Sequence, residues 1–175
     1  MASQNELRVL LSGGDRRSVG NSNKVVSLAY RDPTILPFLV NLLEDKNILV
    51  RMRAADALEK VTQKNRDALN PSKPQLLRIA KESKDQEVKW HLAQMLPGLT
   101  LSPEESKIVF KLMEQYLKDK SSIVRTCALQ AMVELYLRRG IYRERAQLAL
   151  KDAFKNGTPA MKARARKLSL LIKNV

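Results

Sequence analysis

The chain has 175 residues and a formal net charge of +14, from 32 Lys and Arg against 18 Asp and Glu. Its apolar fraction of 44% suffices for a buried core, which excludes a wholly disordered chain. The single cysteine, Cys127, excludes an internal disulfide and a zinc site built from several thiolates. No apolar run approaches the roughly 18 residues of a membrane span, and the first residues lack a signal-peptide pattern. A soluble, cytoplasmic protein that does not contact membranes is therefore expected.

The first predicted elements form a partial unit over residues 3–31. Ser3 and Glu6 have the spacing of a capping box, which predicts a helix over residues 3–11. A loop containing Gly13 and Gly14 follows, and residues 23–30 are predicted to form a second helix.

Four segments with a common apolar pattern follow this unit. They begin at Val50, Val88, Val124 and Met161, which are 38, 36 and 37 residues apart. In each segment, apolar or small residues recur at offsets 0, 4, 7, 8 and 11, interrupted only by Ser169. These offsets fall on one side of a helix, and a second amphipathic stretch precedes each segment. The preceding stretches are residues 35–44, 75–83, 108–117 and 146–154.

The sequence therefore predicts an all-α fold of helical hairpins, because one hairpin cannot bury its apolar faces alone. The hairpins are expected at residues 32–66, 70–100, 102–139 and 142–173, within a single domain over residues 1–175. Ser102, Pro103 and Glu105 are typical of a helix start, and Gly140 is typical of a helix end. Pro97 is expected to shorten the second helix of its hairpin.

The segment from Asp45 to Leu58 resembles the HEAT repeat and its bacterial HEAT-like relatives, and Asp119 with Val124 and Arg125 repeats its pattern. The second and fourth units depart from it, with Lys89 and Lys162 in place of Arg. The resemblance covers residues 32–172. It implies a right-handed α-α superhelix of the armadillo-like kind, and it says little about function, since such solenoids have many roles.

Each hairpin carries a base directly after the first apolar residue of its second helix. These bases are Arg51, Lys89, Arg125 and Lys162. The resemblance implies a structural ladder, in which they pair with the acids of the preceding turns. The acids are Asp45, Asp85 and Asp119, and the clearest rungs are Asp45 with Arg51 and Asp119 with Arg125. The alternative is that these cations, aligned at the repeat spacing, bind along a linear anion.

Positions opposite the apolar stripe are expected to face a groove lined by the second helices. They include Met52, Trp90 and Thr126. Trp90 is either a binding anchor or a filler beside neighbouring helices, because exposed aromatic area is costly unless it is used. His91 has no second ligand at helical spacing, so we expect no metal site. Cys127 is expected to be a packing thiol.

The basic surplus is concentrated at the C-terminal end. Residues 136–175 hold eleven Lys and Arg against two acids, which accounts for +9 of the net +14. Arg138 and Arg139 precede a turn, whereas Arg164 and Lys167 belong to the last helix. This end is either a solvated cap or a contact surface for an acidic protein or a nucleic acid.

The favoured function is a non-enzymatic binding module or scaffold that docks an acidic protein partner. The expected contacts are anchors at Trp90, Met52 and Thr126 and steering charges at Arg53, Arg138, Arg139, Arg164 and Lys167. No catalytic set, metal or cofactor is expected. One alternative is a protein that binds the nucleic-acid backbone. Another is a relative of the HEAT-like alkylpurine DNA glycosylases, for which Asp56 is the nearest candidate carboxylate. A relation to the HEAT-like bilin lyases is a further alternative.

Overall fold

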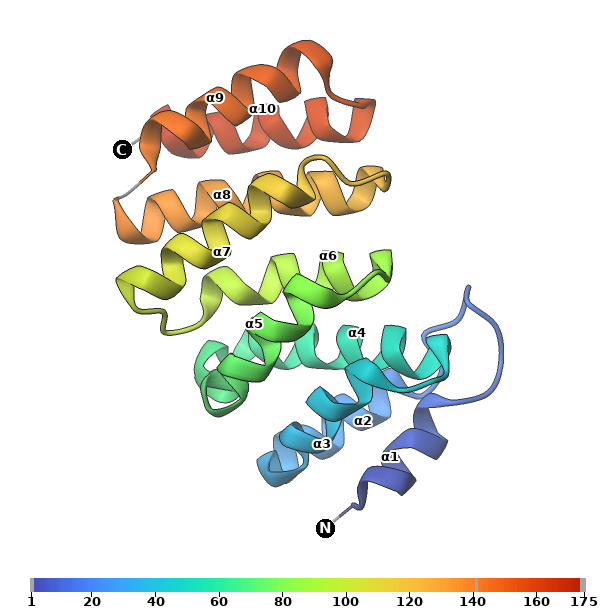
Figure 1. The fold of residues 1–175 in the computed structure, drawn as a ribbon. Coiled ribbons are helices and arrows are strands. Elements are labelled where there is room, and N and C mark those ends of the chain that lie inside the picture. The colour runs from blue at the N-terminus through green and yellow to red at the C-terminus, as the bar shows by residue number, and fades with distance from the viewer. Residues whose placement is uncertain (1, 141, 174–175) are drawn as a thin grey trace. The chain divides into compact units, whose positions relative to one another are not determined.

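A computed structural model describes residues 2–140 and 142–173, which form helices joined by turns, with no strand in these two ranges (Figure 1). The chain divides into two compact units, Met1–Thr100 and Leu101–Val175. The prediction of an all-α fold of stacked helical hairpins is confirmed, and the units divide between two of the expected hairpins.

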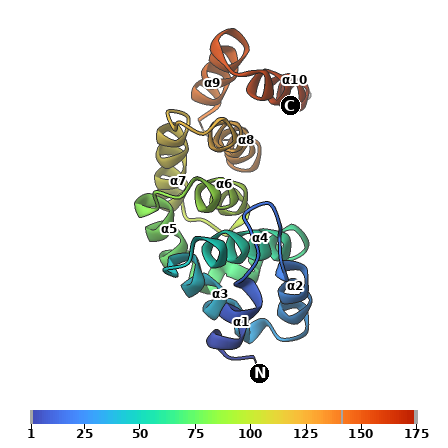
Figure 2. The same cartoon turned by 90° about the vertical axis from the view of Figure 1, so that its right-hand side faces the viewer.

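Unit 1 consists of three successive pairs of helices. The first pair is α1 (Gln4–Leu11) and α2 (Ser22–Arg31). The second pair is α3 (Leu36–Asn41), flanked by the 3-10 turns η1 (Pro33–Ile35) and η2 (Leu42–Glu44), and α4 (Ile48–Lys64). The third pair is α5 (Lys73–Glu82) and α6 (Gln86–Met95), flanked by η3 (Arg66–Ser72) and η4 (Leu96–Gly98). The second helices α2, α4 and α6 stack on one another, and the first helices line the other side (Figure 2).

Unit 2 consists of two hairpins. They are α7 (Pro103–Tyr116) with α8 (Ser122–Arg139), and α9 (Arg143–Asn156) with α10 (Pro159–Lys173). Helix α10 packs on α8 and on α9, and a core cluster that includes Leu129, Val133, Leu150 and Leu168 fills the space between them.

The apolar stripe of the repeat is the core of each hairpin. All its members are buried in all four repeat segments except Ser169, which is half-buried. Burial of one Leu or Val side chain contributes about 1.5–3 kcal/mol. Because each stripe contacts its own first helix and the neighbouring hairpin, stacking supplies the burial that a single hairpin lacks.

The predicted start and stop signals are present as hydrogen bonds. The Glu6 carboxylate accepts from the Ser3 N–H at 2.7 Å, and Glu105 accepts from the Ser102 N–H at the same distance. Gly140 ends α8 with φ 65°. Helix α6 ends at Met95 and continues as a 3-10 turn through Pro97, as predicted.

Within the residues that the structure describes, no helix is both long and apolar enough to cross a membrane.

Candidate binding surfaces

Two arginines of unit 1, Arg8 on α1 and Arg51 on α4, link successive hairpins. Arg8 Nε donates to Asp45 Oδ2 at 2.6 Å, and Arg51 Nε forms a short ion pair with Asp85. Arg51 Nη1 donates to the Asp45 carbonyl at 2.5 Å and to the Lys46 carbonyl at 3.0 Å. Each arginine therefore pairs with the acid of the following hairpin, while Arg51 also caps its own turn.

This arrangement corrects the predicted ladder in its partners. Arg51 contacts the backbone carbonyl of Asp45 rather than its carboxylate, because that carboxylate already accepts from Arg8. Arg125 makes the same turn contacts, with Nη1 donating to the carbonyls of Asp119 at 2.6 Å and Lys120 at 3.1 Å. The contribution of Arg8 was missed, because it belongs to the partial unit, which lacks the repeat pattern.

The pKa of Asp45 lies below its ordinary value. Burial acts to raise this pKa, but hydrogen bonds from the Arg8 guanidinium and the Asn47 N–H, together with the charges of Arg8 and Arg51, outweigh it. The carboxylate is therefore a structural member of the turn, and it is not available to an outside ligand.

Arg53 is a buried structural residue, so the prediction that it steers a partner is wrong. Its side chain is 1% exposed. All three of its nitrogens donate to backbone carbonyls of residues 11–18. The acceptors are the carbonyls of Leu11 (2.9 Å), Ser12 (3.2 Å), Gly13 (2.6 Å), Asp15 (3.0 Å) and Ser18 (3.2 Å). Arg53 thus fixes the loop between α1 and α2, and no sequence pattern indicated this, since the loop lies about 40 residues earlier.

Two further features fit the same loop to the helices: a close approach at Gly20 and an ion pair of Arg16. Gly20 has φ +52°, and a Cβ there would lie 2.8 Å from Arg53 Cζ, so only glycine fits against the guanidinium. Arg16 forms a short ion pair with Glu87 on α6, whose side chain is almost fully buried. The loop of residues 12–21 is therefore packed against the second helices of unit 1.

Trp90 lies half-buried on α6 beside His91, with ring centroids 5.5 Å apart. His91 Nδ1 is in close hydrogen-bonding contact with Glu59 on α4, and Gln94 Nε2 donates to the same carboxylate at 2.7 Å. These polar contacts connect α4 to α6 and position the face that carries Trp90. The described residues contain no group of three or more His, Cys, Asp or Glu arranged to hold a metal ion.

Other residues expected in the groove also have local partners. Met52 is half-buried on α4, and the Thr126 hydroxyl donates to the Ser122 carbonyl at 2.7 Å. The Asp56 carboxylate accepts from the Ser22 hydroxyl in a short hydrogen bond and from Lys60 Nζ at 2.7 Å. Asp56 is therefore engaged in holding α2 to α4.

The basic residues singled out in unit 2 differ in how much charge they offer. Arg138 Nε pairs with Glu134 at 2.9 Å, and Arg139 also has an interaction partner. Arg164 donates to the neutral amide of Gln130 on α8, so its charge is not neutralised. Lys167 is exposed and has no carboxylate within 4.0 Å among the described residues.

Further exposed cations lie on the two helices of the last hairpin. Lys151 and Lys155 on α9 and Arg166 on α10 likewise form no ion pair in the part of unit 2 that the structure describes. Sequence reasoning counted these residues but did not select them, because their pairing depends on where the acids of neighbouring helices lie. We use the name basic face for the exposed cations of these two helices, which are Lys151, Lys155, Arg164, Arg166 and Lys167.

Large apolar side chains alternate with the cations of the basic face. Leu148 is 67% exposed on α9, and Leu170 and Leu171 are 61% and 52% exposed on α10. At 100° per residue, Leu170 lies between Arg166 and Lys167 around the helix. The basic face thus offers apolar contact area as well as positive charge.

An aromatic cluster anchors α9 to α7. The Phe110 and Tyr142 rings stack with centroids 4.3 Å apart, and the Arg145 guanidinium lies 5.2 Å from the Phe110 centroid. Arg145 also forms a short ion pair with Glu114. Its charge is used inside unit 2, so Arg145 is not part of the basic face.

Comparison with known proteins agrees with the repeat geometry. Residues 25–96 match the family model for HEAT repeats. No curated protein matches the chain. Repeats of this kind commonly serve as scaffolds for protein interaction.

Proposed function

We propose that this HEAT-repeat protein is a non-enzymatic binding module that docks an acidic protein partner on its basic face. The proposal treats the partial unit and the four hairpins as one functional domain. It places the protein in the cytoplasm, where the lone thiol Cys127 suits a reducing environment.

The alternation of exposed leucines with unneutralised cations on α9 and α10 carries this proposal. Exposed apolar area rimmed by charged residues is typical of protein interaction sites. Residues 101–175 hold 16 Lys and Arg against 7 Asp and Glu, so the field around unit 2 attracts an acidic partner and accelerates its association.

A protein partner is favoured over a nucleic acid by the leucines. Binding to a phosphate backbone uses cations and hydrogen-bond donors, and it gains nothing from Leu148, Leu170 and Leu171. Trp90 and Met52 are proposed as additional anchors in unit 1, and Thr126 is proposed as one in unit 2. Arg138 and Arg139 are proposed to add to the local field.

The test compares three fluorescent probes by polarisation with the full chain. The first is an acidic amphipathic peptide with Glu and Leu at helical spacing, the second is a peptide of Glu alone with the same charge, and the third is a short DNA duplex. We expect the Glu-Leu peptide to bind most tightly. Substitution of Leu148, Leu170 and Leu171 with Ser should remove its advantage over the Glu peptide.

Charge reversal supplies the matched control. One variant replaces four cations of the basic face with Glu, namely Lys151, Lys155, Arg166 and Lys167. It should bind the Glu-Leu peptide at least about 100-fold more weakly, which is equivalent to about 2.7 kcal/mol. A control variant replaces four exposed lysines of unit 1 with Glu and so makes the same change in net charge. These are Lys24, Lys46, Lys81 and Lys84. Equal losses in the two variants would show that only net charge matters, and duplex binding tighter than peptide binding would replace the proposal with the nucleic-acid alternative.

A further inference from the structure

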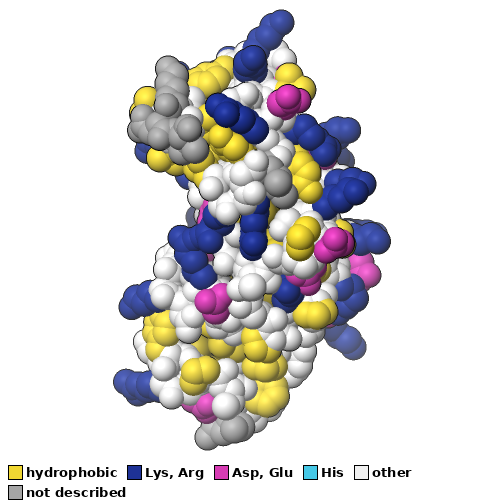
Figure 3. Space-filling model, turned by 90° about the vertical axis from the view of Figure 1, so that its left-hand side faces the viewer, with side chains coloured by type: hydrophobic (Ala, Val, Ile, Leu, Met, Phe, Trp, Pro, Cys, Tyr) yellow, Lys and Arg dark blue, Asp and Glu magenta, His cyan; other side chains and the backbone are white. Residues whose placement is uncertain are grey.

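A pocket of about 380 Å³ opens on unit 1, where the ends of several helices meet. The ends of α2 and α4, the start of α3 and the turn η3 form its walls. Figure 3 shows the side of the molecule that carries the start of α3, and hydrophobic side chains gather over this part of unit 1. The pocket uses none of the residues of the basic face.

The walls of the pocket favour an apolar guest. Pro33, Pro37 and Pro71 line it together with Tyr30 and Val61, and none of its lining residues is charged. Proline has no N–H, so these three positions offer no backbone hydrogen-bond donor to a guest. Tyr30 is 39% exposed, and its hydroxyl donates to the Lys60 carbonyl at 2.9 Å, which holds the ring in place. We call this site the proline pocket.

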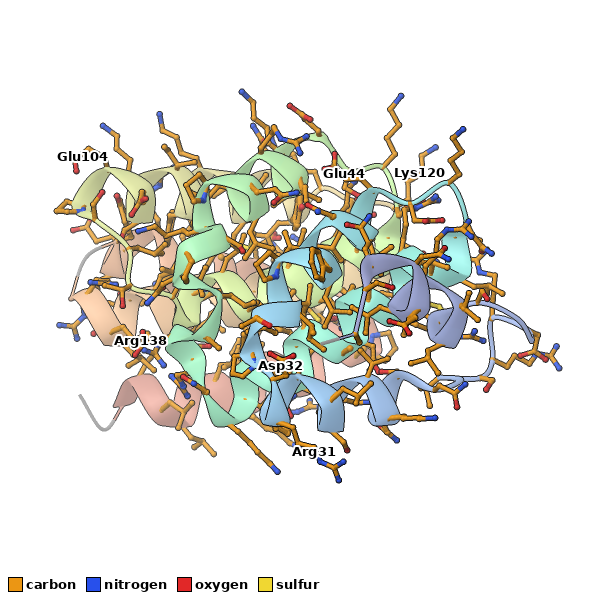
Figure 4. The ribbon with its side chains drawn as sticks, turned by 90° about the horizontal axis from the view of Figure 1, so that it is seen from below. Arg31, Asp32, Glu44, Glu104, Lys120 and Arg138 are labelled. Atoms are coloured by element: carbon orange, nitrogen blue, oxygen red, sulfur yellow. The ribbon has the colours of Figure 1, made fainter. Side chains whose placement is uncertain are left out.

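One cation stands at the edge of the proline pocket. Lys64 Nζ lies 4.9 Å from the centroid of the Tyr30 ring and has no acidic partner within 4.0 Å in the described ranges. Arg31 is next to Tyr30 in sequence but points away from the helices (Figure 4). Lys64 is therefore the cation beside the Tyr30 wall of the pocket, whereas the Asp32 carboxylate is engaged by the N–H and the hydroxyl of Thr34, another lining residue.

Two polar side chains of the pocket have uncommitted hydrogen-bonding capacity. Asn65 and Ser72 both line it, and neither makes a side-chain cap to the helix that it precedes. An extended peptide presents free N–H and C=O groups that can pair with such an amide and hydroxyl, whereas a helix satisfies its own.

We infer that the proline pocket binds an extended segment of a partner protein, which inserts a Leu or Phe side chain and places an Asp or Glu beside Lys64. The volume suits one or two large apolar side chains, and the charge of Lys64 selects the neighbouring acid. This second docking site goes beyond the proposed function and does not depend on the basic face.

The test uses a fluorescein-labelled octapeptide with a Leu-Phe core and two Asp on each side, titrated with the full chain. Ala68 lines the pocket and is half-buried, so Ala68→Trp fills the space without emptying the core. We expect Ala68→Trp to abolish binding and Lys64→Glu to weaken it at least tenfold. Lys64→Glu should also improve binding of a second peptide that carries Lys in place of Asp.

Lys46→Glu, at an exposed lysine that does not line the pocket, is the control for charge, and circular dichroism verifies folding. An octapeptide that fails to bind the unmodified chain, or that binds Ala68→Trp equally well, overturns the inference. Binding that is lost only on charge reversal of the basic face also overturns it, while that result leaves the proposed function intact.

Discussion

Replacement of Arg53 by Met is expected to destabilise unit 1 strongly. Met keeps most of the aliphatic stem but removes all five hydrogen bonds to the loop carbonyls. Arg53 is 1% exposed, so in the unmodified chain the loop carbonyls are satisfied by the guanidinium rather than by bulk water at that position.

The expected loss in the free energy of unfolding depends on whether water can reach each of the five carbonyls. The Leu11 carbonyl takes part in a buried hydrogen bond and would be left unsatisfied, at a cost of about 1–3 kcal/mol. The other four acceptors belong to exposed or half-exposed loop residues that water can reach. Loss of each of these hydrogen bonds should therefore lower the free energy of unfolding by only about 0.5 kcal/mol. The expected loss is therefore about 3–5 kcal/mol, a large fraction of the roughly 5–15 kcal/mol that stabilises a domain.

Urea unfolding followed by far-ultraviolet circular dichroism measures this loss, and trypsin cleavage in the loop reports its opening. Arg53→Lys retains at most three donors and should fall between the unmodified chain and Arg53→Met. Arg17→Met, at an exposed loop arginine, should change stability by less than about 0.5 kcal/mol. A loss below about 1 kcal/mol for Arg53→Met would refute the conclusion that the guanidinium holds the loop.

Three further perturbations test the local contacts. Gly20→Ala should cost about 2–4 kcal/mol in urea unfolding, from positive φ and the 2.8 Å clash, whereas Gly13→Ala, with nothing within 4 Å, should cost only about 1–2 kcal/mol. Asp45 has a lowered pKa in the folded state, so its contribution to stability is present above its ordinary pKa and is lost as the pH falls through the folded pKa. Asp45→Asn should therefore lessen the fall in melting temperature over that pH range. A fall as steep as that of the unmodified chain would contradict this role. Arg145→Gln removes the pair with Glu114 and the contact with the aromatic rings, so amide exchange in α9 should accelerate while α4 is unaffected.

The repeat architecture could be predicted from the sequence because it depends on helical geometry and short-range signals. A stripe at offsets 0, 4, 7, 8 and 11 has one buried side whatever it packs against, and apart from the half-buried Ser169 it is buried in all four hairpins. The capping boxes at Ser3 and Ser102 and the helix end at Gly140 depend on residues no more than a few positions apart.

The candidate surfaces depended on partners that lie a repeat or more away, and these only the tertiary structure decided. Arg51 meets Asp85 of the next hairpin, and Arg53, two positions later, is buried by a loop about 40 residues earlier. The basic face is defined by which cations lack an acid on a neighbouring helix, and the proline pocket exists only where separate helix ends converge. Periodicity fixes which side of each helix is buried, but the identity of a contact across hairpins depends on packing, which no local pattern encodes.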